Sequence, residues 1–131
     1  MGKANGFKSA IDNLEAARKL IRPIRRWVVS SLAVKKDRDG ELVSCSPRLK
    51  EAEAFCALGA VRHANGPGEK QATNFLRQAA YRIQKSEDEV DSSRKPVNND
   101  IISVNDFSDS QENHRRVLKM FALALKLAKG N

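Results

Sequence analysis

The chain has few aromatic residues and no long apolar run, and each shortage excludes a class of protein. Aromatic side chains make up 5% of the 131 residues, so the aliphatic residues and alanine must form most of the core. No apolar run reaches the roughly 20 residues that a membrane-spanning helix needs. The first residues also lack the basic and apolar segments of a signal peptide. We therefore expect a cytoplasmic protein that does not contact a membrane.

Cysteine and histidine are equally scarce, which argues against a disulfide framework and against a zinc site. Cys45 and Cys56 are the only cysteines, and His63 and His114 are the only histidines. Without a secretory signal, two free thiols in a reducing cytosol are expected. Structural zinc sites use ligand pairs only a few residues apart, whereas 10, 6 and 50 residues separate these four in turn. We predict no metal and no cofactor.

The chain has abundant charge, and that charge is unevenly distributed. Its formal net charge is +8, yet residues 86–112 contain half of the 16 acidic residues. Both ends are therefore basic, with an acidic stretch between them. The length suits one domain, so we expect a single helical domain over residues 1–131. An excess of positive charge favours an anionic partner, either a nucleic acid or an acidic protein.

Apolar periodicity and capping residues predict about four helices. Ser9 and Asp12 can form a capping box for the first helix, and Pro23 ends it near Ile21. The first helix is expected over residues 9–21, and the second over residues 46–64 after the Ser46-Pro47 start. The third follows the apolar stripe from Ala72 to Ile83, and the last begins at Ser108 or Ser110. The apolar stripe of the last helix comprises Val117, Leu118, Phe121, Leu125 and Ala128.

Two other segments lack helical periodicity. Residues 27–34 and 41–45 are rich in β-branched residues and flank the turn residues 37–40, so they predict a β-hairpin. Residues 86–100 have little to bury and predict a mobile acidic loop. The fold class is thus mainly α, with about four helices and one small β-hairpin between the first and second helices.

The stretch FCALGAVRHANG, residues 55–66, places Cys56 and His63 on one side of a helix. The rise per residue separates them by roughly 10 Å, whereas a nucleophile and its base need about 3 Å. They are therefore no catalytic pair within this helix. A strip of small residues, including Gly59 and Ala60, instead suits the close approach of another element. We expect Cys56 in the core and His63 at the negative end of the helix dipole.

Two further groups of residues are candidates for binding. Asn105 and Asp106 could bind a ligand, although both residue types also favour capping of the helix that begins just beyond. A basic surface could contact phosphates next to Trp27, which could stack a base but suits the core better. That surface comprises Arg22, Arg25, Arg26, Lys35, Lys36 and Arg38, with Arg115 and Arg116 later in the chain.

The order of Trp27, Asp39-Gly40, CALGAVRHA at residues 56–64 and Asn105-Asp106 resembles a family of small uncharacterised bacterial and phage-associated proteins, a domain of unknown function. The likeness spans about residues 11–128. The matching positions are Cys56, Gly59, Ala60, Ala64, Asn105 and Asp106. The resemblance implies that Asn105 and Asp106 lie near the helix of residues 56–64, as part of a scaffold or of a small polar pocket.

Three functions remain open from the sequence. We favour a non-catalytic binding or accessory module for an anionic partner, with no catalytic residue. A small enzyme would need a polar pocket around His63, Asn105 and Asp106. A homo-oligomeric structural protein would bury the broad apolar face of the last helix, which Leu123 and Leu127 widen.

Overall fold

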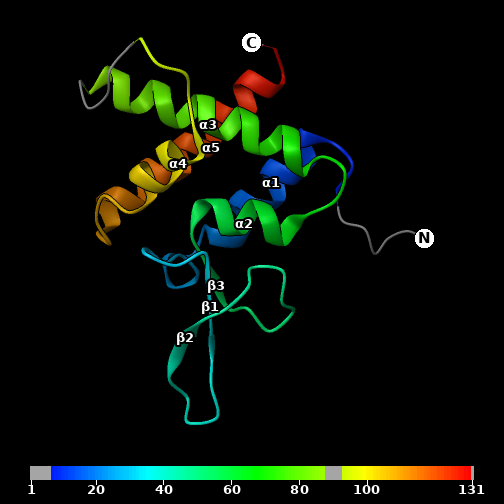
Figure 1. Ribbon diagram of the computed structural model, residues 1–131, viewed down its shortest axis with the longest axis vertical. Coiled ribbons are helices and arrows are strands. Elements are labelled where there is room, and N and C mark those ends of the chain that lie inside the picture. The colour runs from blue at the N-terminus through cyan, green and yellow to red at the C-terminus, as the bar shows by residue number, and fades with distance from the viewer. Residues whose placement is uncertain (1–6, 88–92, 131) are drawn as a thin grey trace.

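A body of helices carries a small β-sheet that projects from one end (Figure 1). The computed structural model describes residues 7–87 and 93–130. The elements in chain order are α1 (Ala10–Ile21), the 3₁₀ helix η2 (Ile24–Arg26), β1 (Ala33–Lys36), β2 (Leu42–Ser44), β3 (Ala54–Phe55), α2 (Ala57–Ala64), α3 (Glu69–Ser86), α4 (Asn98–Asn105) and α5 (Gln111–Ala128). The mainly α class is confirmed, although the described residues form five α-helices rather than about four.

The helices with strong caps begin where the sequence predicts. The Ser9 hydroxyl accepts the Asp12 N–H at 3.0 Å, and α1 ends at Ile21. Of the two predicted starts for the last helix, Ser110 is the cap, because its hydroxyl accepts the Asn113 N–H. Each cap satisfies a backbone donor that the first helical turn leaves without a partner.

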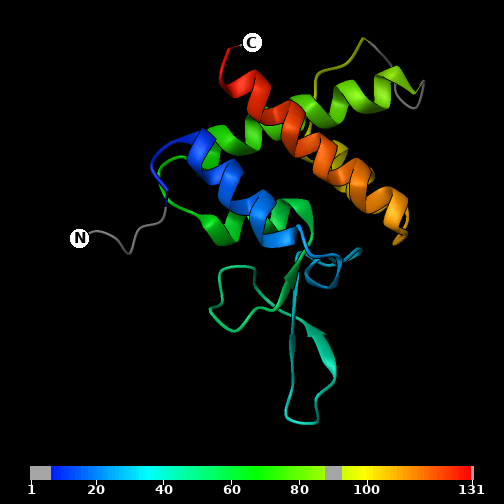
Figure 2. The same cartoon turned by 180° about the vertical axis from the view of Figure 1, so that it is seen from behind.

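The last helix packs against three other helices of the body. α5 packs against α3, α1 and α4 (Figure 2). Met120 and Phe121 are fully buried there, and Leu123 and Leu127 pack against the same core. The broad apolar face of α5 is therefore largely covered by the chain itself. No helix of residues 7–87 and 93–130 is long and apolar enough to cross a membrane.

The second predicted helix ends at Ala64 as expected, but its predicted start is wrong, because the helix begins ten residues later. α2 starts at Ala57, and the Cys56 thiol caps it by accepting the Gly59 N–H. Residues before it are needed elsewhere, because β3 pairs antiparallel with β1. The Ser46 hydroxyl accepts the Arg48 N–H in a turn instead of starting a helix.

The predicted hairpin exists, but the sheet is shorter and has a third strand. β1 pairs antiparallel with β2, with Val34 opposite Ser44, and the strand order is β2-β1-β3. The Asp37 carboxylate accepts the N–H groups of Asp39 and Glu41 and so forms the turn. Residues 28–32, which begin with Val28 and Val29, lie outside β1, because the Ser30 N–H donates to Asp106 at the end of α4.

The two ends of the predicted acidic loop of residues 86–100 belong to helices, since Ser86 is the last residue of α3. The centre of the predicted loop, residues 88–92, lies outside the described residues, while residues 98–100 form the first turn of α4. The Asp100 carboxylate is 2% exposed and accepts hydrogen bonds from Arg94, Gln84 and the Val97 N–H. Burial alone would raise the pKa of Asp100, but these donors outweigh it and hold the pKa below its ordinary value.

Candidate functional site

Asn105 joins three segments that are distant in sequence. Its Oδ1 accepts the Trp27 Nε1–H at 2.7 Å and the Ala57 N–H at 2.9 Å. Its Nδ2 donates to the Val28 carbonyl at 3.0 Å and to Asp106 at 2.8 Å. These four bonds use the full capacity of an amide, and the residue is 1% exposed. Asn105 therefore holds the fold together and has no group left for a ligand.

Asp106 adds a further contact between the end of α4 and the segment after Trp27. It follows the last residue of α4, so the expectation that Asn105 and Asp106 cap the next helix is wrong. Ser110 takes that role because the chain makes one more turn before α5. The Asp106 carboxylate also accepts the Ser30 N–H at 3.0 Å, and Ser30 adopts a φ of 68° that non-glycine residues rarely take. This contact fixes the segment after Trp27 against α4.

A small cavity lies beside the contact between Asp106 and Ser30. It measures about 180 Å³, and its lining residues are Ser30, Ser31, Leu32, Cys56, Ile102 and Asp106. Ligand pockets usually measure about 300–1,000 Å³, so this one is small. Burial raises the pKa of the Cys56 thiol to about 11, and a thiol in that state is a poor nucleophile. Within the described residues, no three His, Cys, Asp or Glu side chains are placed to hold a metal ion.

His63 does not join Asn105 and Asp106. Its Nδ1 donates to the Pro47 carbonyl at 2.7 Å, and its ring lies 4.6 Å from the Phe55 ring. Along α2 it follows Ala57 by six residues, which is a rise of about 9 Å. The structure thus brings Asn105 and Asp106 next to the start of α2, as the resemblance implies, and leaves His63 near its end.

The small residues of α2 allow a close approach, as predicted. The Cys56 N–H donates to the Leu32 carbonyl at 3.1 Å, and a Cβ built on Gly59 would lie 1.8 Å from that oxygen. Trp27 is also in the core, 5% exposed, with its ring 5.2 Å from that of His114. It is therefore not placed to stack a base.

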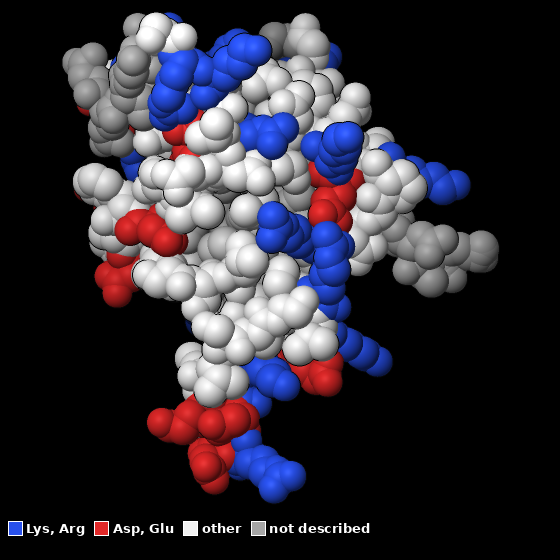
Figure 3. Space-filling view, in the orientation of Figure 1, with Lys and Arg blue, Asp and Glu red and all other residues white. Residues whose placement is uncertain are grey.

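Most of the basic residues predicted from the sequence fall into two groups. At the hairpin tip, cations and carboxylates alternate along the chain, and Figure 3 shows blue and red side chains mixed there. The cations are Lys35, Lys36 and Arg38, and the carboxylates are Asp37, Asp39 and Glu41. The tip therefore has no net charge. Arg22, Arg25 and Arg26 lie at the end of α1 and on η2, where Arg22 and Arg25 are exposed.

A more strongly cationic surface follows α3, and the sequence reasoning missed it. Two hollows of about 400 and 430 Å³ adjoin on this face, and Arg77 lines both. We call them together the α3 groove. Its cations are Arg62, Lys70, Arg77, Arg82 and Lys95. Figure 3 shows Lys and Arg side chains spread over this face of the molecule.

Among the described residues, one carboxylate lines the α3 groove, and it is already neutralised. Glu69 accepts two hydrogen bonds from Arg48, at 2.9 and 2.6 Å. Arg77 is positioned by two neutral amides, Asn74 and Asn98. Among the described residues, none of the five groove cations forms an ion pair. Within residues 7–87 and 93–130, the charge of these five cations is therefore uncompensated.

A family model described as a family of unknown function (DUF6197) matches residues 8–127. The chain belongs to this family. No curated protein and no solved structure matches the chain. In this DUF6197 chain, the residues that carry the resemblance stabilise the fold. Cys56 caps α2, and the absence of a side chain at Gly59 allows the Leu32 carbonyl to approach the helix. Asn105 and Asp106 bind Trp27 and the segment after it.

The DUF6197 sequence does contain a signal for the α3 groove. α3 has four cations and one carboxylate, Glu69, in 18 residues. Lys70 and Arg77 are seven residues apart and so lie on the same side of the helix. The apolar stripe of this segment predicts the helix but not the groove. The charged side of α3 becomes part of a groove because the fold brings Arg62 of α2 and Lys95, which precedes α4, next to it.

Proposed function

We propose that the chain is a non-catalytic module that binds the phosphate backbone of a nucleic acid in the α3 groove. The observation that carries the proposal is the set of five cations in two adjoining hollows, whose one carboxylate is held by Arg48. Positive charge that tracks a groove attracts a polyanion and releases its counterions. The free state of Cys45 and Cys56 suits a site of action in the reducing cytosol.

The composition of the groove favours phosphates over an acidic protein. Three of its cations are arginines, whose planar guanidinium groups fit phosphate oxygens in pairs. Thr73, Asn74 and Gln78 add neutral polar groups. The cores of protein–protein interfaces are instead rich in accessible aromatic side chains, and the aromatic residue of the groove, Tyr81, is 8% exposed. Backbone contact without reading of bases is the mode that this surface supports.

Fluorescence anisotropy with labelled single- and double-stranded DNA and RNA at about 50 mM salt tests the proposal, because phosphate contacts are strongest at low salt. The variant Lys70→Ala/Arg82→Ala/Lys95→Ala removes three groove charges. The control Lys35→Ala/Lys36→Ala/Arg38→Ala removes three charges from the hairpin tip. We expect the groove variant to bind at least about tenfold more weakly than the wild type, and the control to bind almost as tightly.

Three outcomes contradict this proposal. Absence of binding by the wild-type chain rejects a nucleic acid partner. Equal loss in the two variants shows that net charge alone drives binding. Tighter binding of a polyglutamate peptide than of any nucleic acid, with the same loss in the groove variant, replaces the nucleic acid by an acidic protein.

A further inference from the structure

A separate pocket lies where the end of α3 meets the start of α5. It measures about 560 Å³, which is within the usual range for small-molecule sites. Its walls come from Ile83 and Ser86 of α3, from Phe107 and Ser108 between the helices, and from the first turns of α5. We call it the Phe107 pocket. Of the residues predicted to form the basic surface, Arg115 and Arg116 line it.

Phe107 gives this pocket an exposed aromatic wall. Its side chain is 66% exposed, the largest fraction among the exposed large hydrophobic residues described. The ring is held in place by Arg116, whose guanidinium carbon lies 5.1 Å from the ring centroid. An exposed aromatic ring costs solvation free energy and is a common feature of ligand-binding surfaces.

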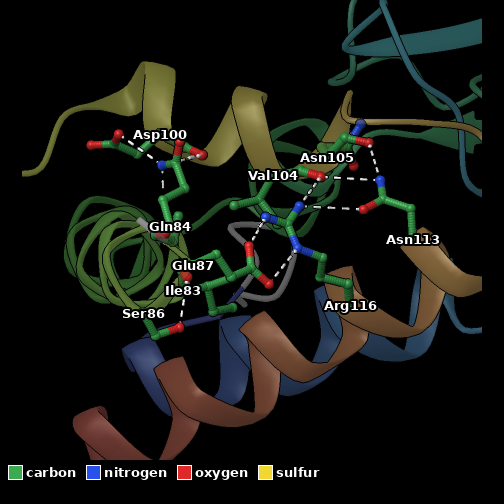
Figure 4. Close-up of polar contacts among 10 residues, drawn as sticks. Ile83, Gln84, Ser86, Glu87, Asp100, Val104, Asn105, Asn113 and Arg116 are labelled. Carbon is green, nitrogen blue, oxygen red and sulfur yellow. Dashed lines mark hydrogen bonds and ion pairs between the residues drawn. The ribbon is translucent and has the colours of Figure 1, made fainter. Parts of the chain in front are cut away.

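Arg116 is a fixed part of the pocket rather than a mobile surface side chain. It reaches from α5 between the ends of α3 and α4 (Figure 4). It pairs with Glu87 and donates to the Val104 carbonyl and to Asn113. These contacts neutralise Arg116 and hold the wall that carries Phe107.

The charge available to a ligand comes from the next positions of α5. Arg115 and Lys119 line the pocket and are one helical turn apart. Both are exposed, and neither forms an ion pair among the described residues. Two carboxylates line the pocket, Glu112 and Glu87, and Glu87 pairs with Arg116. Glu112 and Ser110 offer acceptors for hydroxyl groups. The first turn of α5 also favours an anion, through its backbone N–H groups.

We infer that the Phe107 pocket binds a small molecule that combines an aromatic ring with a phosphate, such as a nucleoside monophosphate. The ring stacks on Phe107, and the phosphate binds Arg115 and Lys119. Glu112 and Ser110 accept hydrogen bonds from sugar hydroxyl groups where the ligand has a sugar. This site is independent of the α3 groove, since the two have no lining residue in common.

Titration of the full chain by isothermal calorimetry or by amide chemical shifts tests this inference. The probes are adenosine monophosphate, phenyl phosphate, adenosine and inorganic phosphate. We expect at least one of the first two to bind with a dissociation constant of about 1 mM or tighter. Adenosine and inorganic phosphate should bind at least about tenfold more weakly, because each lacks one of the two recognised groups.

Variants assign the binding to the pocket. Phe107→Ala and Arg115→Ala/Lys119→Ala should each weaken binding of the tighter probe at least about tenfold. The controls Leu42→Ala, an exposed apolar residue of β2, and Lys126→Ala/Lys129→Ala, exposed cations near the end of α5, should leave it unchanged. The groove variant Lys70→Ala/Arg82→Ala/Lys95→Ala should also bind the probe normally, which separates this inference from the proposed function.

The result that overturns the inference is equally specific. It fails if neither ring-bearing phosphate binds at about 1 mM. It fails also if inorganic phosphate or adenosine binds as tightly as the probes that carry both a ring and a phosphate. It fails likewise if the Phe107 and Arg115/Lys119 variants bind these probes as tightly as the wild type does. Adenosine monophosphate binding far above phenyl phosphate identifies a nucleotide, and the reverse identifies a simpler aryl phosphate.

Discussion

Asn105 connects the end of α4 to both Trp27 and the first turn of α2 through one buried side chain. Its Oδ1 is shared by an indole N–H and a backbone N–H, each of which is otherwise buried without a partner. A buried donor that loses its acceptor costs about 1–3 kcal/mol. The residue therefore contributes to stability through the groups that it satisfies on other elements.

We predict that Asn105→Ala lowers the free energy of unfolding by about 2–4 kcal/mol, since it leaves two buried donors unsatisfied. Urea denaturation followed by circular dichroism measures this change. Asn99→Ala is the matched control, because Asn99 is exposed on the same helix, and it should change stability by less than about 0.5 kcal/mol. Equal effects of the two substitutions would contradict the role of Asn105.

Single residues were placed from the sequence with mixed success, for a physical reason. Cys56 and Trp27 are apolar enough that burial follows from their chemistry alone. Asn105 and Asp106 favour caps by local preference. Their observed partners are distant in sequence, because Asn105 binds Trp27, 78 residues away, and Asp106 binds Ser30, 76 residues away. Nothing near them in sequence reveals such partners.

At the scale of elements, the approach of β1 to α2 depends on the absence of a side chain. The Leu32 carbonyl, just before β1, occupies the position that a Cβ on Gly59 would take. Only glycine permits this contact without displacing the backbone of one element. The small sheet is thereby held against the helical body.

Gly59→Ala is therefore expected to destabilise the chain by about 2–3 kcal/mol. In an ordinary helix the same substitution stabilises by up to about 1 kcal/mol, because alanine has the higher helix propensity. The sign of the change is thus the test, and thermal unfolding measures it. A rise in melting temperature would show that the two elements separate freely.

The start of α4 depends on the ionised state of Asp100. Its folded-state pKa is below the ordinary value, so its ion pair and hydrogen bonds stabilise the fold at pH 7. This contribution is lost as the pH falls through the depressed pKa. We predict that Asp100→Asn is less stable than the wild type at pH 7 and that the difference shrinks towards pH 3, as measured by urea denaturation. A difference that does not change with pH would contradict this assignment.

Elements with strong local signals were predictable, and those that depend on pairing were not. Ser9, Pro23 and the apolar stripe of α3 are local features, and the helices that they mark were found. β3 has two residues and exists because it pairs with β1. A thiol cap at Cys56 lies outside the usual set of capping residues, so local preferences predict a helix start at Ser46 instead.

At the scale of the whole molecule, the positive charge is unevenly placed in space as well as in sequence. The hairpin tip mixes cations with carboxylates, whereas the α3 groove collects cations from α2, α3 and the segment before α4. Net charge was visible from composition. Its concentration in one groove follows only from the packing of these elements.

The salt dependence of nucleic acid binding tests the central claim most directly. For phosphate contacts, log Kd changes linearly with log salt concentration, by about 0.7–0.9 per contact. The wild-type chain should show a steep slope, and Lys70→Ala/Arg82→Ala/Lys95→Ala should lower it by about two units, while the hairpin-tip variant leaves it unchanged. A slope that is the same in the groove variant and the wild type would contradict phosphate binding by the α3 groove.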